Sequence, residues 1–388
     1  MWLYLIIFFI PVLAYADGDA VNRNKTFLAY YLGALALFVG LSDMFGGYDR
    51  YIYADVFDSI ANGITYGLRY DTIAALTYFE PGYSSLSLLI ALFSANRYIY
   101  ILTITLIMYF CFYKAFSKNM TNYPLAIIIF LGMAFFFSFT YLRQVLAFSV
   151  AWIGVNYLIE GKKWKFFIIA LIVASLHKSG VVFAGLYFMP TKKWDPSKVI
   201  AILAVCAIVG FSGITSSLYD AYASISTMSM NGYNADSGAR IAYFLEVAFF
   251  VCIILSNYKK IDSSRHNLIF LNMAWAFCAI LLLFIRSSEG GRIAWYFTLG
   301  IIYTITLICT TARNRKKIKN SLGIVMITVM LLLYVRVYVA WQNGYYLYPY
   351  KTFLTNGHRN PDPLWSHFEY DHRYDNDKFY RPPFRFPK

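Results

Sequence analysis

The chain has 388 residues, of which 59% are hydrophobic, 20% aromatic and only 14% charged. A soluble domain carries about 25% charged residues, so a soluble globule of this composition would expose large apolar patches to water. The net charge of +14 would suggest a nucleic-acid partner in a soluble protein. In a membrane protein it first reflects orientation, because inner loops collect Lys and Arg, so we expect no nucleic-acid partner.

Apolar runs of roughly 20 residues recur along the chain and are continuous rather than alternating, which indicates an all-α, polytopic membrane protein and excludes an outer-membrane barrel. The first run, residues 2–16, ends in an Ala-Tyr-Ala that looks like a signal-peptidase site, but no Lys or Arg precedes it. We therefore expect a retained helix with its N-terminus outside. The segments expected to cross are residues 2–16, 26–41, 97–116, 123–140, 142–159, 199–218, 241–257, 267–285, 293–312 and 320–341.

Two further apolar segments are harder to assign. Residues 84–95 are too short to cross, and residues 166–189 are interrupted at 177–180 by His-Lys-Ser-Gly. If 166–189 crosses once, three loops rich in Lys and Arg move outside, against the positive-inside rule. These loops are residues 190–198, 258–266 and 313–319. We therefore expect a re-entrant hairpin of two half-helices, both termini outside, and about 10–12 transmembrane helices in all.

Three outer regions are long enough to be more than turns. Residues 42–83 are rich in Tyr, Asp and Gly, and residues 219–240 are small and polar. The tail, residues 342–388, is rich in Tyr and Pro, and after residue 360 it mixes both charge signs with several prolines. That composition is typical of a largely disordered segment. The sequence thus predicts a membrane domain, residues 1–341, followed by an outer C-terminal tail.

The basic residues differ in kind between the two expected sides. Inner loops carry mostly Lys, whereas the outer ends of the helices carry Arg, including Arg143, Arg286 and Arg292. Arg grips phosphate or carboxylate oxygens two at a time, and a charge near membrane depth is costly enough to indicate a function. Arg143 also begins a helix, where the dipole attracts anions. The alternative is that these Arg residues only flank the spans.

Carboxylates stand beside tyrosines in the first outer loop. Asp49 follows Gly-Gly-Tyr, and Glu80 stands three residues before Tyr83 at the start of the short apolar segment. Carboxylates accept hydrogen bonds from sugar hydroxyls and one of them could act as a general base, while aromatic rings stack on sugar faces. The alternative is a solvated loop with local Asp–Arg pairs.

His177 stands alone among the histidines in lying within an apolar run, at the expected tip of the hairpin beside Lys178. Broken helices in membranes line cavities. His177 is therefore a candidate general base, or a ligand for phosphate or sugar, and Lys178 a positioning charge; the alternative is a packing histidine. Farther along, Arg292 and Tyr296 share one helical face, with Phe297 adjacent.

Metal and nucleotide chemistry have little support. The five cysteines all fall in apolar runs and none forms C-x-x-C, so we expect buried apolar residues. Two Asp-x-Asp triplets, at 17–19 and 375–377, lie in a short inner loop and in the tail. No Walker A, G-x-S-x-G or H-E-x-x-H motif occurs. We therefore expect no metal and no cofactor.

Six short motifs follow one another along the chain. They are Gly47-Tyr48-Asp49, Glu80-Pro81-Gly82-Tyr83, Arg143-Gln144, His177-Lys178-Ser179, Arg292 with Tyr296-Phe297, and Tyr348-Pro349-Tyr350. As an ordered set they resemble the EpsG branch of the Wzy-type bacterial polysaccharide polymerases, from about residue 40 to 352. The family more often has Gly-Thr-Asp in the first motif, and the tail after residue 355 has no counterpart.

The resemblance implies an integral-membrane glycosyltransferase of the C type, in O-antigen, capsule or exopolysaccharide synthesis. Such a polymerase moves a growing glycan from undecaprenyl pyrophosphate to a second lipid-linked repeat unit, at the periplasmic face of the bacterial inner membrane. Its partners would be the lipid-linked donor and acceptor and membrane lipid; the involvement of a chain-length regulator stays open. No metal or nucleotide sugar would be needed.

On this basis the site residues fall into three groups. The pyrophosphate would be bound by Arg143, Arg286, Arg292 and Lys178. The first candidate for the general base would be His177, followed by Glu80 and Asp49. The glycan would be bound by Tyr83, Gln144, Tyr296 and Phe297.

Three other functions stay open. A flippase or transporter of lipid-linked oligosaccharides would share the Arg residues and aromatic rings, but the inverted repeats typical of transporters are not visible in the sequence. A membrane acyltransferase using His177 would need a donor from the inner face. An O-antigen ligase differs from a polymerase only in its acceptor, which the sequence does not reveal.

Overall fold

The computed structural model of the protein describes residues 1–17, 19–44, 48–218, 238–287, 290–315, 321–342, 347, 350–355 and 372–385. The regular secondary structure of these residues is helical, apart from one isolated bridge between Ser42 and Thr352. Five of the described helices are long and apolar enough to cross a membrane, and six shorter apolar helices accompany them. The predicted class, an all-α polytopic membrane protein, is confirmed.

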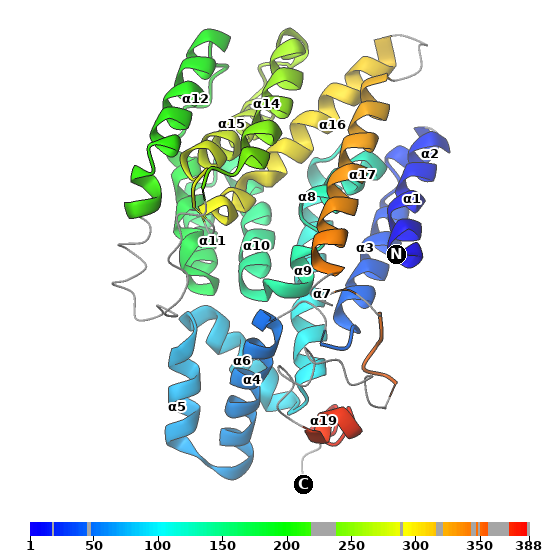
Figure 1. The fold of residues 1–388 in the computed structure, drawn as a ribbon, viewed down its shortest axis with the longest axis vertical. Coiled ribbons are helices and arrows are strands. Elements are labelled where there is room, and N and C mark those ends of the chain that lie inside the picture. Colours follow the sequence, from blue (N-terminus) through cyan, green and yellow to red (C-terminus); the bar gives the residue numbers. More distant parts are fainter. Residues whose placement is uncertain are drawn as a thin grey trace.

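The first quarter of the chain begins in the helix bundle and then leaves it. Its bundle helices are α1 (Trp2–Asp17), α2 (Asp19–Asn22) and α3 (Lys25–Gly40). Three helices follow that we call the cap: α4 (Tyr48–Tyr66), α5 (Arg69–Tyr78) and α6 (Pro81–Phe93). Figure 1 shows the cap beyond one end of the bundle, with the C-terminus nearby. We refer to that end of the bundle as the cap end.

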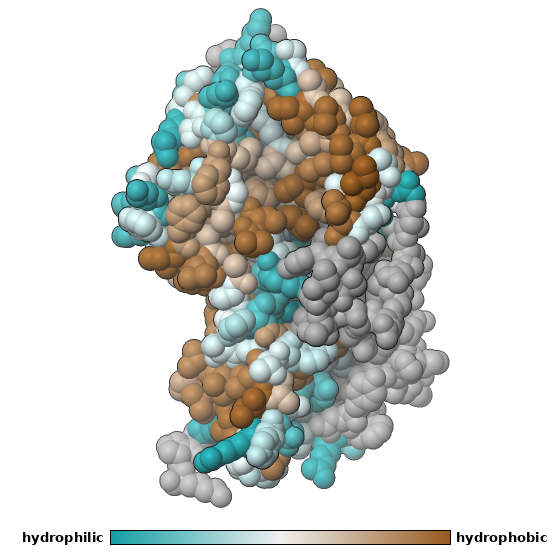
Figure 2. Space-filling view, turned by 90° about the vertical axis from the view of Figure 1, so that its left-hand side faces the viewer, coloured by the Kyte–Doolittle hydropathy of each residue, from teal (hydrophilic) through white to brown (hydrophobic). Residues whose placement is uncertain are grey.

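The rest of the bundle follows in chain order. It comprises α7 (Arg97–Asn119), α8 (Tyr123–Met133), α9 (Phe137–Thr140), α10 (Leu142–Ile159), α11 (Lys163–Leu176), η1 (Lys178–Phe188), α12 (Pro196–Phe211), α14 (Ile241–Ser256), η2 (Tyr258–Lys260), α15 (Arg265–Leu283), η3 (Gly290–Phe297), α16 (Thr298–Arg315) and α17 (Ser321–Gln342). Figure 2 shows a broad hydrophobic band over this bundle and a hydrophilic waist between the bundle and the lower part of the molecule.

Helix α8 forms the centre of the bundle. Every residue from Tyr123 to Gly132 is buried, as expected for a helix that is hydrophobic on all sides. It packs against α1, α16 and α17. The chain then turns through the short helix α9 and re-enters the bundle as α10. This turn places Arg143, in the first turn of α10, at the cap end.

The predicted re-entrant hairpin is present as α11 and η1. The two arms are antiparallel, because the ring of Tyr187 near the end of η1 lies 6.1 Å from that of Phe166 near the start of α11. The turn requires glycine at position 180, where a Cβ would lie 2.7 Å from Val173 Cγ1 and 2.8 Å from the Val173 carbonyl oxygen. His177 and Lys178 stand at the tip.

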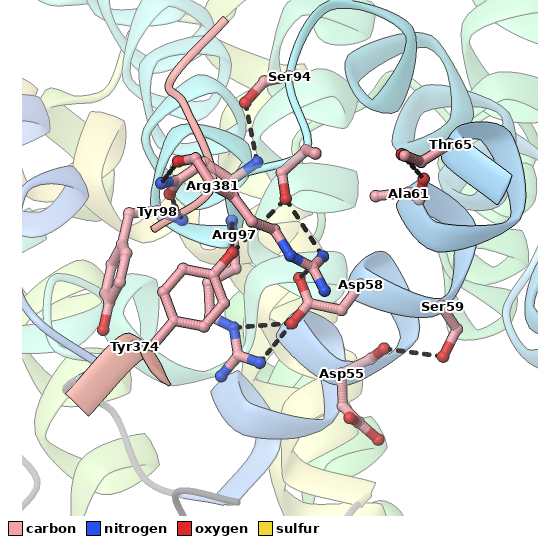
Figure 3. Close-up of polar contacts among 12 residues, drawn as sticks. Asp55, Asp58, Ser59, Ala61, Thr65, Ser94, Arg97, Tyr98, Tyr374 and Arg381 are labelled. Atoms are coloured by element: carbon pink, nitrogen blue, oxygen red, sulfur yellow. Dashed lines mark hydrogen bonds and ion pairs between the residues drawn. The ribbon is translucent and has the colours of Figure 1, made fainter. Parts of the chain in front are cut away.

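The end of the tail differs from the sequence prediction of disorder. Residues 372–385, including α19 (His372–Asn376), pack on the cap and on the start of α7. Asp58 of α4 accepts a hydrogen bond from Arg97 Nε at 3.0 Å and pairs with Arg381 at 3.3 Å, with Tyr374 alongside (Figure 3). The mixed charges that suggest a solvated tail thus find buried partners.

Some predictions fall outside the described residues. They are those on residues 219–237 and 356–371, and parts of the motifs at 47–49 and 348–350.

Candidate functional site

Glu80 joins three elements at the cap end. It precedes α6, with extended backbone at φ −60° and ψ 146° and Pro81 in the first turn, but its side chain does not cap its own helix. Its Oε2 accepts a hydrogen bond from Arg143 Nη1 at 2.5 Å, and its Oε1 accepts one from the Lys178 N–H at 2.9 Å. One carboxylate therefore ties α6 to α10 and to the hairpin tip.

The approach of α6 to the hairpin depends on Gly82. A Cβ at this position would lie 2.2 Å from Ser175 Oγ and 2.9 Å from the Ser175 carbonyl carbon. Real Cβ atoms do not come so close to other heavy atoms, so any side chain here pushes α6 away from the end of α11. The Glu80–Lys178 hydrogen bond therefore requires glycine at 82.

We expect Gly82→Ala to lower the stability of the protein by about 1–3 kcal/mol, because overpacking forces backbone shifts. The same displacement should weaken activity that depends on Glu80. Gly185→Ala, in the hairpin that α6 approaches, is the matched control, since nothing lies within 4 Å of a Cβ there. Thermal unfolding in detergent checks the prediction; equal melting temperatures for the two variants would contradict it.

Arg143 lies against aromatic rings as well as against Glu80. The carbon of its guanidinium stands 4.3 Å from the centre of the Phe79 ring and 5.5 Å from that of Tyr53. Its buried Nε has no hydrogen-bond partner among the residues that the structure describes. The salt bridge to Glu80 thus leaves Arg143 with donors for a further anion.

Burial alone would raise the pKa of Glu80, but the charges of Arg143 and His177 and the Lys178 N–H together lower it below its ordinary value. Glu80 is therefore ionised at neutral pH, and both of its oxygens already accept hydrogen bonds. These contacts suit a residue that holds others in place better than a residue that takes up a proton.

Asp49 lies in the first turn of α4. The next residue, Arg50, holds this turn in place. The guanidinium of Arg50 is buried and donates from Nη2 to the carbonyls of Val39 and Ser42, each at 3.2 Å. Arg50, one of the outer arginines, thus has a structural role at the end of α3. It places the adjacent Asp49 at the cap end of the bundle.

Asp49 lies near the two cations of the site. Burial raises the pKa of Asp49 above its ordinary value, and the charges of Arg292 and Arg143 oppose that rise. No hydrogen bond to its carboxylate occurs within the described parts of the chain. Of the three candidate bases, Asp49 is therefore the carboxylate with free acceptor capacity.

Arg292, in η3, is attached to α10. Gln144 Nε2 donates to the Arg292 carbonyl oxygen at 3.0 Å, and Arg292 Nη2 donates to Tyr141 Oη at 3.1 Å. The guanidinium also stacks over the Tyr141 ring at 4.1 Å. Gln144, expected to contact sugar, here fixes the backbone that carries Arg292.

His177 belongs to a hydrogen-bonded chain that reaches Tyr296. His177 Nδ1 accepts the Ser179 N–H at 3.3 Å, so in the neutral ring the proton lies on Nε2. Ser179 Oγ, 2.7 Å from Nδ1, then donates to it and stands 3.1 Å from Tyr296 Oη. This arrangement leaves His177 Nε2–H as a donor rather than a base.

The remaining predicted residues lie around this group or apart from it. Tyr83 is buried, accepts a hydrogen bond from Tyr100 Oη at 2.8 Å and supports Phe79 edge-on. Phe297 is also buried. Arg286 lies beside the end of α12, where its Nη1 donates to the Phe211 carbonyl at 3.2 Å. The structure thus brings together Asp49, Glu80, Arg143, His177, Lys178 and Arg292, and places Arg286 against a different helix.

A cavity of about 400 Å³ opens beside Arg292, and we call it the lateral cavity. Its wall comes from α8 to α10, α14, α15, η3, α16 and α17, and includes Tyr141, Arg240, Tyr243, Glu246, Arg292 and Trp341. Glu246 was not singled out from the sequence. The available signal was a lone carboxylate in the apolar run 241–257.

Fold and site together define a multi-pass membrane protein with a cationic, aromatic-lined group of polar residues at one end of its bundle. The model of the EpsG family matches residues 27–352, which include all of the candidate site residues, and the chain belongs to this family. Membership supports a polysaccharide-polymerase type of role in general. Comparison with curated proteins and with solved structures gave no match.

Proposed function

We propose that the protein is a polysaccharide polymerase of the integral-membrane glycosyltransferase C type. It transfers a growing glycan from undecaprenyl pyrophosphate to the terminal sugar of a second lipid-linked repeat unit, with its cap end facing the periplasm. The observation that carries this proposal is that two permanent cations, Arg143 of α10 and Arg292 of the adjoining η3, both act through their charge on the carboxylate of Asp49. The reaction needs stabilisation of a diphosphate leaving group and one acceptor for a hydroxyl proton.

The proposed step uses few groups. The acceptor hydroxyl oxygen forms a bond to the anomeric carbon of the donor sugar, and the bond from that carbon to the pyrophosphate oxygen breaks. The electron pair leaves with the pyrophosphate, where Arg143 and Arg292 bind the developing charge. The hydroxyl proton passes to Asp49. No cofactor takes part in this step.

The geometry changes the ranking of the three candidate bases. Asp49 replaces His177 as the first candidate, because Nδ1 of His177 is already an acceptor for Ser179 and Nε2 carries the proton. His177 Nε2–H suits a phosphate or sugar oxygen. Glu80 acts as a positioning residue through Arg143 and the hairpin backbone.

The pH dependence tests the role of Asp49. A base with a raised pKa is active when deprotonated, so the rate should fall as the pH drops through a value above that of an ordinary Asp. Asp49→Asn should lower the rate about 10²- to 10⁴-fold and remove this acid limb. Asp55→Asn, on an exposed face of the same helix, is the control. An unchanged profile in Asp49→Asn would assign the proton to another group.

Product analysis tests the function itself. The purified protein is placed in proteoliposomes with lipid-linked repeat units extracted from a strain that lacks it. A polymerase yields a ladder of longer lipid-linked glycans. A flippase moves the units without forming a new linkage, and a ligase forms linkages only when lipid A core is supplied. Either of these two results would overturn the proposal.

A further inference from the structure

A carboxylate within α14 has no task in the proposed reaction. Glu246 lies in an apolar helix and lines the lateral cavity. Across the described part of the chain, its carboxylate makes no hydrogen bond. An ionisable side chain inside a membrane helix is costly, and such residues mark pathways for charged substrates.

Arg336 of α17 acts on Glu246 through its charge, and its own side chain is exposed. Glu246 follows the start of α14 at Ile241, and Arg336 precedes the end of α17 at Gln342. At 1.5 Å per residue, Glu246 lies about 7.5 Å and Arg336 about 9 Å inside its helix. The two charges therefore stand at a similar depth below the cap end.

The helices that carry this pair flank the lateral cavity. Figure 1 shows α14 and α17 on either side of α16, and all three helices contribute to the cavity wall. Apolar side chains such as Leu281 and Phe277 line it, together with the rings of Trp295 and Trp341. The cations Arg240 and Arg292 also line the wall. Apolar walls with cations suit an amphiphile that has an apolar chain and a phosphate head.

We propose that the lateral cavity is the docking site of a polyprenyl pyrophosphate, which enters between α14 and α17 past Glu246 and Arg336. This proposal deepens the proposed function and rests on it for the identity of the lipid. Arg336 attracts the pyrophosphate from the membrane. Glu246, a negative charge in the cavity wall, repels a bound pyrophosphate and so keeps it from being held too tightly for release.

The two charges give opposite predictions for binding. Arg336→Gln removes a cation and should weaken binding of undecaprenyl pyrophosphate about tenfold, whereas Arg336→Lys should stay near the wild-type affinity. Glu246→Gln removes a repulsive charge and should strengthen binding several-fold and slow turnover, so that KM and kcat fall together. Glu160→Gln, in an exposed ion pair with Lys118, is the matched carboxylate control.

The measurement is binding to the full-length protein in nanodiscs, by native mass spectrometry. The probes are undecaprenyl pyrophosphate, neutral undecaprenol and phosphatidylglycerol. We expect Arg336→Gln to weaken and Glu246→Gln to strengthen the binding of undecaprenyl pyrophosphate only. The binding of undecaprenol should be unchanged in both variants. Equal shifts for phosphatidylglycerol would show a general anionic-lipid site and overturn the proposal, as would unchanged binding in both variants.

Failure of this site and failure of the proposed function are distinguishable. Opposite binding shifts without any polymerisation by the wild type would retain the docking site and overturn the polymerase. Polymerisation with unchanged binding in Glu246→Gln and Arg336→Gln would do the reverse. Arg336→Lys, which keeps the charge, separates lost attraction from lost folding.

Discussion

Arg143→Gln should lower polymerisation by about 10²- to 10³-fold, the loss typical of removing one preorganised electrostatic contact to a developing charge. Arg143 is held by Glu80 at 2.5 Å and rests on the Phe79 ring, so its guanidinium is fixed before substrate arrives. Gln is neutral and cannot compensate a diphosphate. The measurement is the initial rate of glycan elongation in proteoliposomes, corrected for the amount of folded protein.

Two further variants separate charge from geometry. Arg143→Lys keeps the charge but loses the planar fork, and should retain part of the rate. Glu80→Gln keeps an acceptor for the Lys178 N–H while releasing Arg143, so it should reduce the rate less than Arg143→Gln. Full-length polymer at normal levels from Arg143→Gln would remove this residue from the pyrophosphate site.

Asp58→Ala should destabilise the protein by about 3–5 kcal/mol, because it leaves Arg97 buried without its carboxylate partner. Asp58 is the shared partner of Arg97 and Arg381, and the side chains of Asp58 and Arg97 are only 8% and 6% exposed. Tyr374 also covers Arg97, with the guanidinium carbon 4.2 Å from the ring centre. The measurement is the thermal unfolding temperature in detergent.

The control for this prediction lies one turn away on the same helix. Asp55 is exposed and visible beside Asp58 in Figure 3, so Asp55→Ala should change the unfolding free energy by less than about 0.5 kcal/mol. A similar small effect of Asp58→Ala would show that the tail residues contribute nothing to stability. The tail would then be attached through other contacts, such as the hydrogen bond from Asn96 Nδ2 to the Arg381 carbonyl oxygen.

The fold could be predicted because each of its elements has a local signal in the sequence. Apolar length gives the helices, and the Lys-rich loops decide the course of residues 166–189, which the structure shows as the hairpin α11–η1. Broken helicity at His177 was visible as a polar motif inside an apolar run. These inferences need no knowledge of which distant side chains meet.

The sequence predicts which residues are candidates for the site, but not how their side chains meet. The sequence indicates Glu80 and Arg143 as candidates, but their salt bridge joins positions far apart in the chain. The same limit applies to Arg50, whose structural role depends on carbonyls at the end of α3. The preference for Asp49 over His177 rests on the hydrogen-bond direction at Nδ1, which follows from the turn at Ser179.

The contacts of tail residues 372–385 could not be predicted from the sequence for a different reason. Mixed charges and prolines predict a solvated chain unless a partner surface is known, and here the surface is formed by Asp58 and by Asn96 before α7. Lys378 is buried beside Asp43, with 3.5 Å between Nζ and Oδ1. A lone segment gives no sign of such partners.

The attachment of the tail has a consequence for how the protein is made. Residues 372–385 follow α17 in the chain, so they reach the cap only after α17 has been synthesised. Until then Asp58 has Arg97 but lacks Arg381. The cap that carries Asp49 and Glu80 therefore gains this contact only after α17 has been made. A nascent chain that has made α17 but not residues 372–385 thus has its membrane helices before the tail is attached to the cap.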